Sequence, residues 1–326
     1  MLTQSFFKLF PPPKFLNIPY AGLDICEDAV RCIEYSHGRK GLTINRYITK
    51  VLPPGIIESG HIKDEKVLVE TIKKVAGELK ISVAKASLPE ERMYLFKTEV
   101  PDAYEEDIRQ NIEFKLEENV PLPASESVFF FDLIPHNALS IETKNTKFAS
   151  VSVAPHDLIS TYLSVIQKAG ITVLSFEIQA KAIARALVSP NSTETQIITY
   201  IMKKKTGIYI VCGGVVCFTS TVAWGHSTIL ESKDMVNTAS DLKKEISKVY
   251  GYWVEHGGGT NISRIILVGK GSLSAGLASH CSPDPRIPVE IGQIWQNAFS
   301  GENYIPPISY EDSLDYAVAA GLALPS

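Results

Sequence analysis

The chain has 326 residues, of which 45% are hydrophobic and 21% are charged, a composition that is typical of a soluble globular protein. This length is too great for one ordinary core and predicts two lobes of roughly 150 residues each. The formal net charge is −4 and no long basic stripe is present, so the charges give no reason to expect a nucleic-acid partner.

The cysteines and histidines suggest neither a disulfide framework nor a metal site. The five cysteines include no C-x-x-C pair, which predicts reduced thiols in a cytoplasmic protein and side chains that serve as small core residues. The seven histidines show no i, i+4 pair and no nearby pair of cysteines, so a structural metal is not expected.

The N-terminal segment, residues 1–20, is rich in phenylalanine. It lacks the early basic region, the sustained apolar stretch and the cleavage site of a signal peptide. We expect it to fold back on its own domain, and contact with a membrane or a partner is the alternative.

The first lobe is expected to comprise residues 21–90 and 171–190. Two apolar runs around an acidic tip open it, and their pattern predicts a hairpin that a third antiparallel strand joins. A helical period of apolar residues follows, and it predicts an amphipathic helix. The predicted elements are a hairpin over 22–35, a strand over 42–52, a helix over 65–80, a strand over 84–88, a strand over 171–177 and a helix over 179–188.

A different unit is expected at residues 91–170, inserted into the first lobe. Asp102 is predicted to be the N-cap of its first helix, and Tyr104, Ile108, Ile112 and Leu116 are predicted to form the core stripe of that helix. The predicted elements are a strand over 92–100, this helix, strands over 127–134 and 147–153, and a helix over 156–169.

The second lobe is expected at residues 191–326. The run 207–224 is uncharged and about as long as a membrane span, but Gly213-Gly214 in its middle favours a hairpin between two β-branched strands. The predicted elements are strands over 196–202, 207–212 and 215–223, a helix over 240–255 and a strand over 265–268. Their order repeats that of the first lobe, and such a repeat with one insertion is typical of the actin-like architecture.

Several stretches of the chain resemble one family in this architecture. The family is PilM, the actin-like assembly protein of type IV pili and type II secretion-type systems, which is related more distantly to the cell-division protein FtsA. The similar stretches run from about residue 20 to the end of the chain, and they are Gly22–Ile25, Ala29–Glu34, Ser87–Arg92, Ile112–Pro123, Ile265–Leu277 and Tyr316–Leu324.

The resemblance implies an α/β, actin-like (ribonuclease H-like) two-lobe fold with an inserted strand-helix-strand-strand subdomain. It also implies that the cytoplasmic tail of PilN, a single-pass membrane protein, docks in a groove between this subdomain and the first lobe. Pilus motor ATPases are possible further partners. The protein would then be cytoplasmic and held at the inner membrane through its partners.

The phosphate loops depart from the family pattern, in which each first hairpin carries Asp-Ile-Gly. Here the first loop reads Asp24-Ile-Cys-Glu-Asp28, so cysteine replaces the glycine and two carboxylates would face a triphosphate. The second reads Tyr200-Ile-Met-Lys-Lys-Lys205 and lacks the carboxylate that would hold Mg²⁺ or position water. The three lysines of the second loop either attract phosphate or form a solvated turn.

The adenosine motif of the family is retained in outline. Gly269 and Gly271 leave backbone room for a ribose or adenine, and Ser272 or Ser274 is placed to cap the next helix. An ordinary strand-to-helix turn is the alternative interpretation. If ATP with magnesium is bound, the resemblance assigns the nucleotide to Gly22, Asp24, Lys203, Lys204, Gly269, Gly271 and Ser272, with Asp24 as the metal ligand.

Two functions are compatible with these observations. The first is a non-catalytic scaffold that docks a pilus or secretion membrane protein, and the second is an active actin-like ATPase or a nucleotide-binding switch. We favour the scaffold because no general base stands out and Asp24 is the single well-placed phosphate-site carboxylate. A further hypothesis is that Glu27 and Asp28 approach Lys203–Lys205 and close the cleft by ion pairs.

Overall fold

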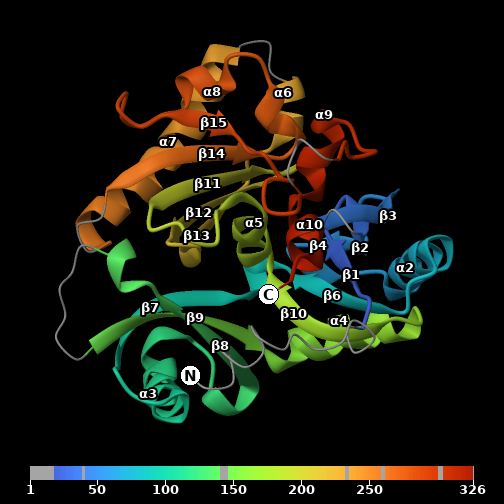
Figure 1. Cartoon of the computed structure of the whole chain (residues 1–326), viewed down its shortest axis with the longest axis horizontal. Coiled ribbons are helices and arrows are strands. Elements are labelled where there is room, and N and C mark those ends of the chain that lie inside the picture. The colour runs from blue at the N-terminus through green and yellow to red at the C-terminus, as the bar shows by residue number, and fades with distance from the viewer. Residues whose placement is uncertain are drawn as a thin grey trace.

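The computed structural model describes residues 18–38, 41–139, 146–231, 235–257, 261–299 and 304–325. It shows two lobes and a smaller subdomain, the second lobe lying above the other two units in Figure 1. Most of the predicted N-terminal segment, and Gly258 and Gly259 after the long helix, lie outside the described residues.

The first lobe is built on a five-stranded sheet in the order β10-β6-β1-β2-β3. The predicted antiparallel hairpin is confirmed, since Leu23 of β1 lies opposite Cys32 of β2. Strand β1 also pairs with β6, in parallel, and it is buried along its whole length as a central strand should be. The strands are β1 (Ala21–Ile25), β2 (Ala29–Gly38), β3 (Gly41–Val51), β6 (Val83–Leu88) and β10 (Thr172–Ile178).

The second lobe repeats this sheet in the order β13-β12-β11-β14-β15, which confirms the predicted internal repeat. Gly213 and Gly214, with φ of 57° and 85°, form the tight turn of the β12–β13 hairpin. No helix among the described residues is long and apolar enough to cross a membrane. The strands are β11 (Thr195–Ile201), β12 (Thr206–Cys212), β13 (Val215–Val222), β14 (Ile262–Val268) and β15 (Val289–Ile291).

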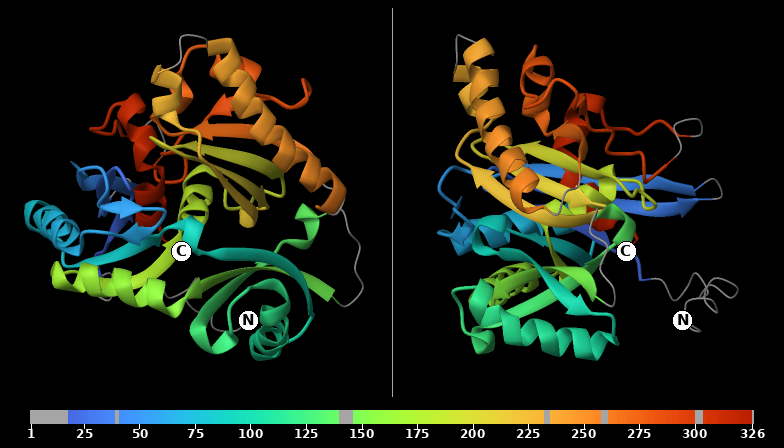
Figure 2. Two further views of the ribbon diagram at one scale, coloured as in Figure 1. Left: turned by 180° about the vertical axis from the view of Figure 1, so that it is seen from behind. Right: turned by 90° about the vertical axis from the view of Figure 1, so that its left-hand side faces the viewer.

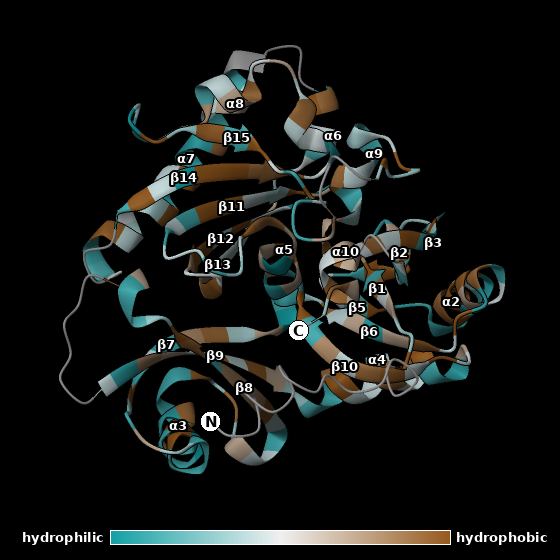
Figure 3. Ribbon diagram, in the orientation of Figure 1, coloured by the Kyte–Doolittle hydropathy of each residue, from teal (hydrophilic) through white to brown (hydrophobic). Residues whose placement is uncertain are grey.

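Helices cover the outer face of each sheet. Strand β14 is brown along most of its length in Figure 3, and these hydrophobic residues are buried against the helices on the two faces of the sheet. Helix α7 (Met235–His256) crosses the outer face of the second sheet, as the view from behind in Figure 2 shows. Helices α2 (Glu65–Leu79) and α4 (His156–Lys168) do the same for the first sheet.

Two helices lie between the lobes and join them. Helix α5 (Gln179–Leu187) and the C-terminal helix α10 (Ala317–Ala323) pack on the inner face of the second sheet in one core. Helix α10 also packs on β1 of the first lobe, although the sequence assigned residues 191–326 to the second lobe. The helices approach so closely that a Cβ on Gly321 would overlap the carbonyl oxygen of Ala182.

The inserted subdomain is a three-stranded sheet in the order β7-β9-β8, with one helix packed on it. Two details of the predicted helix are wrong: it begins after Tyr104, not Asp102, and Tyr104 is 85% exposed. The carboxylate of Asp102 instead forms an ion pair with Lys147 of β9, so it does not accept a hydrogen bond from the first turn of the helix. The elements are β7 (Tyr94–Pro101), α3 (Glu105–Asn119), β8 (Ser127–Ile134) and β9 (Thr146–Pro155).

The remaining described elements are short and surround the cleft or the top of the second lobe. They are β4 (Ile57–Glu58), β5 (His61–Ile62), α6 (His226–Glu231), α8 (Leu277–His280), α9 (Tyr310–Ser313) and several 3-10 turns, among them Glu90–Arg92 and Lys270–Leu273. All five cysteines are buried as free thiols, as the sequence predicts.

Candidate functional site: the cleft between the lobes

The first hairpins of the two lobes meet at the cleft, where the resemblance places a nucleotide. The Nζ atom of Lys205, in the β11–β12 turn, lies 3.5 Å from Oε1 of Glu27 in the β1–β2 turn. The predicted ion pair across the cleft is therefore confirmed for these two residues. Asp28 does not take part, because its carboxylate lies 2.9 Å from Arg31 on its own hairpin.

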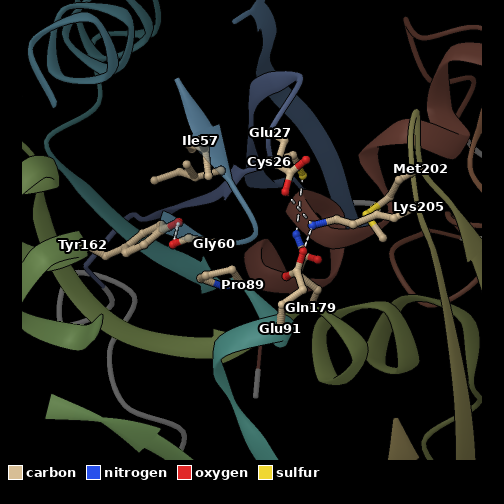
Figure 4. Close-up of a pocket in the computed structure, with 11 residues that line it drawn as sticks. Cys26, Glu27, Ile57, Gly60, Pro89, Glu91, Tyr162, Gln179, Met202 and Lys205 are labelled. Atoms are coloured by element: carbon tan, nitrogen blue, oxygen red, sulfur yellow. Dashed lines mark hydrogen bonds and ion pairs between the residues drawn. The ribbon is translucent and has the colours of Figure 1, made fainter. Parts of the chain in front are cut away.

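Lys205 has a second carboxylate partner. Its ammonium group contacts Glu91, and Figure 4 shows the lysine side chain pointing between Glu27 and Glu91. The side chains of all three are at most 24% exposed, so solvent screens these ion pairs less than fully exposed ones. A built-in cation with two carboxylates thus lies between the two hairpins.

Asp24, the predicted magnesium ligand, is fully buried and its carboxylate is already hydrogen-bonded. Ser87 and Gln179 donate to Oδ1 at 2.9 and 3.2 Å, and the Cys26 thiol donates to Oδ2 at 3.0 Å. Burial raises the pKa of Asp24, and the nearby Arg31 guanidinium lowers it in part. The carboxylate therefore holds β1, β6 and α5 together.

The cysteine that replaces the family's glycine has a structural consequence. The Cys26 backbone N–H donates to Ala29 at 3.0 Å and closes the hairpin turn, while the thiol covers Asp24. Burial, followed by the charge of Asp24, raises the pKa of the Cys26 thiol well above its usual value. The side chain is consequently a neutral donor that seals the carboxylate from the cleft.

Arg31 links the first hairpin to the predicted adenosine motif. Arg31 is a buried residue, and its guanidinium lies 2.9 Å from Asp28 and 3.8 Å from Asp315, which precedes α10. Asp315 in turn accepts a hydrogen bond of 3.0 Å from the backbone N–H of Lys270. A carboxylate of the protein itself therefore uses this backbone donor of the motif.

The glycines of the motif are required for packing. A Cβ on Gly269, whose φ is 91°, would overlap the carbonyl oxygen of Ile201 on β11, and one on Gly271 would press on the same residue. Neither serine is a helix cap: the following turn has no side-chain cap, and α8 begins after Gly276. The Ser272 hydroxyl is buried and has no hydrogen-bond partner among the described residues.

Two cavities lie beside the hairpin tips, and both Glu27 and Lys205 line the larger one. The larger, about 470 Å³, lies over both hairpin tips and the segment 51–59, and the exposed Lys203 and Lys204 line it. The smaller, about 200 Å³, lies beside Lys270 and Asp315 and is also lined by Lys203. The space enclosed around Lys205 itself is about 10 Å³, room for about one water molecule.

These residues do not fit a magnesium-bound triphosphate between the hairpins. The carboxylate of Asp24 is buried and Lys205 lies where the two tips meet. Within the described ranges no group of three or more His, Cys, Asp and Glu residues is arranged to hold a metal ion. Mg²⁺ needs an accessible carboxylate together with phosphate oxygens, and Asp24 does not offer one.

The predicted site residues are thus divided among different roles. Gly22 packs against α10, and a Cβ on Gly22 would overlap the carbonyl oxygen of Ala319. Lys203 and Lys204 line the larger cavity. The nucleotide assignment did not include Glu91, Arg31 or Asp315. Glu91 belongs to a stretch that resembles the family, Ser87–Arg92, but no local pattern indicates its partner in the other lobe.

Glu90 lies between β6 and β7, where the chain passes from the first lobe to the inserted subdomain, and it makes the stability of the protein depend on pH. Its carboxylate accepts a hydrogen bond of 2.6 Å from the Ala180 backbone N–H at the start of α5. Burial raises its pKa from 4.5 to about 7. Since the folded state binds this proton more tightly than the unfolded state, the stability it contributes is full below pH 4.5 and is lost as the pH rises to about 7.

Relative to the wild type, the free energy of unfolding of the variant Glu90→Gln is expected to rise by about 2–3 kcal/mol between pH 5 and pH 8, because the amide cannot ionise. Urea denaturation at the two pH values measures this difference. Glu70→Gln, on the exposed face of α2, is the control and should change the free energy of unfolding by the same amount at pH 5 and at pH 8. Equal effects of the two variants would contradict the assignment.

Comparisons with known proteins agree with this architecture. The family model of the type IV pilus assembly protein PilM matches residues 22–233. A chain of the "PilM-PilN type IV pilus biogenesis complex" matches with a TM-score of 0.75 at 17% identity, over 94% of this chain and 98% of that chain. The ethanolamine utilization protein EutJ from Carboxydothermus hydrogenoformans matches with a TM-score of 0.52 at 11% identity, over 96% and 90%.

At such identities the solved structures show a common fold alone. No curated protein sequence matches the chain. The family model, however, covers more than half of the chain and includes the first hairpin, the inserted subdomain and the second hairpin. The chain therefore belongs to the family of the type IV pilus assembly protein PilM.

Proposed function

We propose that this protein is a cytoplasmic scaffold of type IV pilus assembly that works without ATP hydrolysis. The observation that carries the proposal is the position of Lys205, paired with Glu27 and Glu91 between the two hairpins. An ammonium group there supplies the positive charge that a phosphate-binding cleft otherwise takes from Mg²⁺. The protein's own charges therefore join the two hairpin tips where the phosphates would lie.

The proposed partner is the cytoplasmic tail of a PilN-like membrane protein. The solved relative with a TM-score of 0.75 is part of a complex with PilN, and the match extends over the inserted subdomain of this chain. Pilus motor ATPases are proposed as further partners. Association with the inner membrane would then come through these partners.

Calorimetry with the full chain tests the proposal. Titration of Mg-ATP is expected to give no measurable heat, and phosphate release should stay at background. A synthetic peptide with the sequence of the cytoplasmic tail of the PilN-like protein from the same organism is expected to bind. If the wild type hydrolyses ATP above background and a folded Asp24→Asn variant does not, the proposal that the protein works without ATP hydrolysis is wrong. If the peptide does not bind, the proposed partner is wrong.

A nucleotide-binding switch is the second candidate, and one observation favours it. The cavity of about 200 Å³ lies beside the retained adenosine motif and is lined by Lys203 and Lys270. The buried Ser272 hydroxyl in that motif lacks a partner among the described residues. Binding of ATP without turnover would support this candidate over a pure scaffold.

A further inference from the structure

The cavity of about 470 Å³ at the hairpin tips has walls from both lobes. Three segments of the described chain line it: residues 26–28 of the first hairpin tip, residues 51–59 of the first lobe and residues 202–205 of the second lobe. Its volume lies within the range of about 300–1,000 Å³ that is typical of small-molecule pockets. Gly269 and Gly271 of the predicted adenosine motif are not among the described residues that line it.

The first lobe supplies an apolar wall. Val51 at the end of β3 is 75% exposed, and Pro53 and Pro54 after it are exposed as well. Leu52 and Ile57 also line the cavity and are buried. An apolar body bound here would cover the valine and the two prolines, which water now contacts, and the removal of apolar surface from water favours binding.

The second lobe supplies two cations. Lys203 and Lys204 line the cavity and are exposed, and neither ammonium group forms an ion pair with a residue in the described part of the chain. The third lysine of the same turn, Lys205, is the one that is paired, with Glu27 and Glu91. Lys203 and Lys204 therefore leave two positive charges for a ligand.

Three carboxylates also line the cavity, and two of them already have a cationic partner. Glu27 lies 3.5 Å from Lys205, and Asp28 lies 2.9 Å from Arg31. The third carboxylate belongs to Glu58, which is exposed. Since the two lysines without ion pairs outnumber this one carboxylate, the charges that line the cavity favour an anion.

Hydrogen bonds hold the three lining segments in place. The Leu52 N–H donates to the Asp28 carbonyl at 2.8 Å, and the Ser59 N–H donates to a carboxylate of the same hairpin tip at 2.9 Å. The Ser227 N–H donates to the Lys203 carbonyl at 2.8 Å and fixes the lysine turn. The cavity is therefore largely preformed, and a ligand would not need to order its walls.

We propose that this cavity binds a small amphipathic anion, a molecule with an apolar body and a carboxylate or phosphate group at one end. The apolar body would lie against Val51, Pro53 and Pro54, and the anionic group would bind Lys203 and Lys204. Because these residues belong to different lobes, the ligand would add a contact between the lobes. The site does not depend on which partner the protein binds.

Fluorescence titration of the full chain with 8-anilinonaphthalene-1-sulfonate tests the site, because this probe has an aromatic body and one negative charge. Lys203→Gln and Lys204→Gln are each expected to raise its Kd roughly threefold to tenfold, since each removes a charged contact. Val51→Asp is expected to raise the Kd about tenfold or more, because it removes apolar surface and adds a like charge. The Kd of the neutral analogue N-phenyl-1-naphthylamine should not change in the lysine variants.

Two variants outside the cavity are the matched controls. Lys74→Gln on α2 and Val254→Asp on α7 alter exposed residues that do not line it, and both should leave the Kd of the probe unchanged. If the cavity variants bind the probe as tightly as these controls do, the probe binds elsewhere and the inference is wrong. An excess of Mg-ATP is expected not to displace the probe. Competitive displacement by Mg-ATP would also overturn the inference, since the cavity would then be part of a nucleotide site.

Discussion

Replacing Asp24 with alanine is expected to destabilise the protein by about 3–5 kcal/mol, without removing any ATPase activity. The variant would leave the Ser87 hydroxyl, the Gln179 amide and the Cys26 thiol without their common acceptor in a fully buried site. It would also remove a negative charge near the buried Arg31. Urea denaturation of the wild type and the variant measures the difference.

Two further variants sharpen this prediction. Asp24→Asn keeps the volume and part of the hydrogen bonding, so it should cost less than the alanine variant. Asp241→Ala on α7 removes an exposed aspartate that is paired with Lys244, and its effect should stay within about 0.5 kcal/mol. An Asp24→Ala protein that is as stable as the wild type but has lost measurable ATP turnover would show that Asp24 is catalytic.

The variant Gly321→Ala is expected to cost about 3 kcal/mol or more, although alanine is the better helix former. A Cβ at this position would overlap the Ala182 carbonyl oxygen, a backbone atom that no rotamer change can move. Helices α5 and α10 would have to separate, and both lobes pack against them. The free energy of unfolding from urea denaturation measures the cost.

Gly77→Ala in α2 is the matched control. This glycine is also helical, but it is exposed and a Cβ on it would have nothing within 4 Å. Alanine there should stabilise the protein by about 0.5–1 kcal/mol. Stabilisation by Gly321→Ala of the same size would mean that the two helices can move apart at little cost.

The elements that the sequence predicts well have a regular local period. Helix α2 and the β1–β2 and β12–β13 hairpins follow from helical or strand periodicity and from turn residues, so they need no knowledge of distant contacts. The internal repeat follows from the order of such elements. The start of α3 was misplaced because Asp102 pairs with Lys147 on another strand, a contact that no local pattern reveals.

The candidate site was predictable to a smaller degree. Opposite charges on the two tips, together with the facing hairpins that the fold implies, led to the prediction that Glu27 and Asp28 contact the lysine turn, and this is confirmed for Glu27. The sequence does not indicate which of the three lysines makes the contact, and the structure shows Lys205 between the carboxylates of Glu27 and Glu91. The contact of Lys270 with Asp315 joins residues on separate elements, and only the folded chain brings them together.

The position of α10 has a consequence for the order in which the protein folds during synthesis. Strand β1 lies near the start of the chain, yet its inner face is covered by residues 317–323. A ribosome makes the chain from the N-terminus, so the first sheet must wait with one face bare until these residues emerge. Until then, Gly22 and its neighbours on β1 lack the helix that buries them in the folded protein.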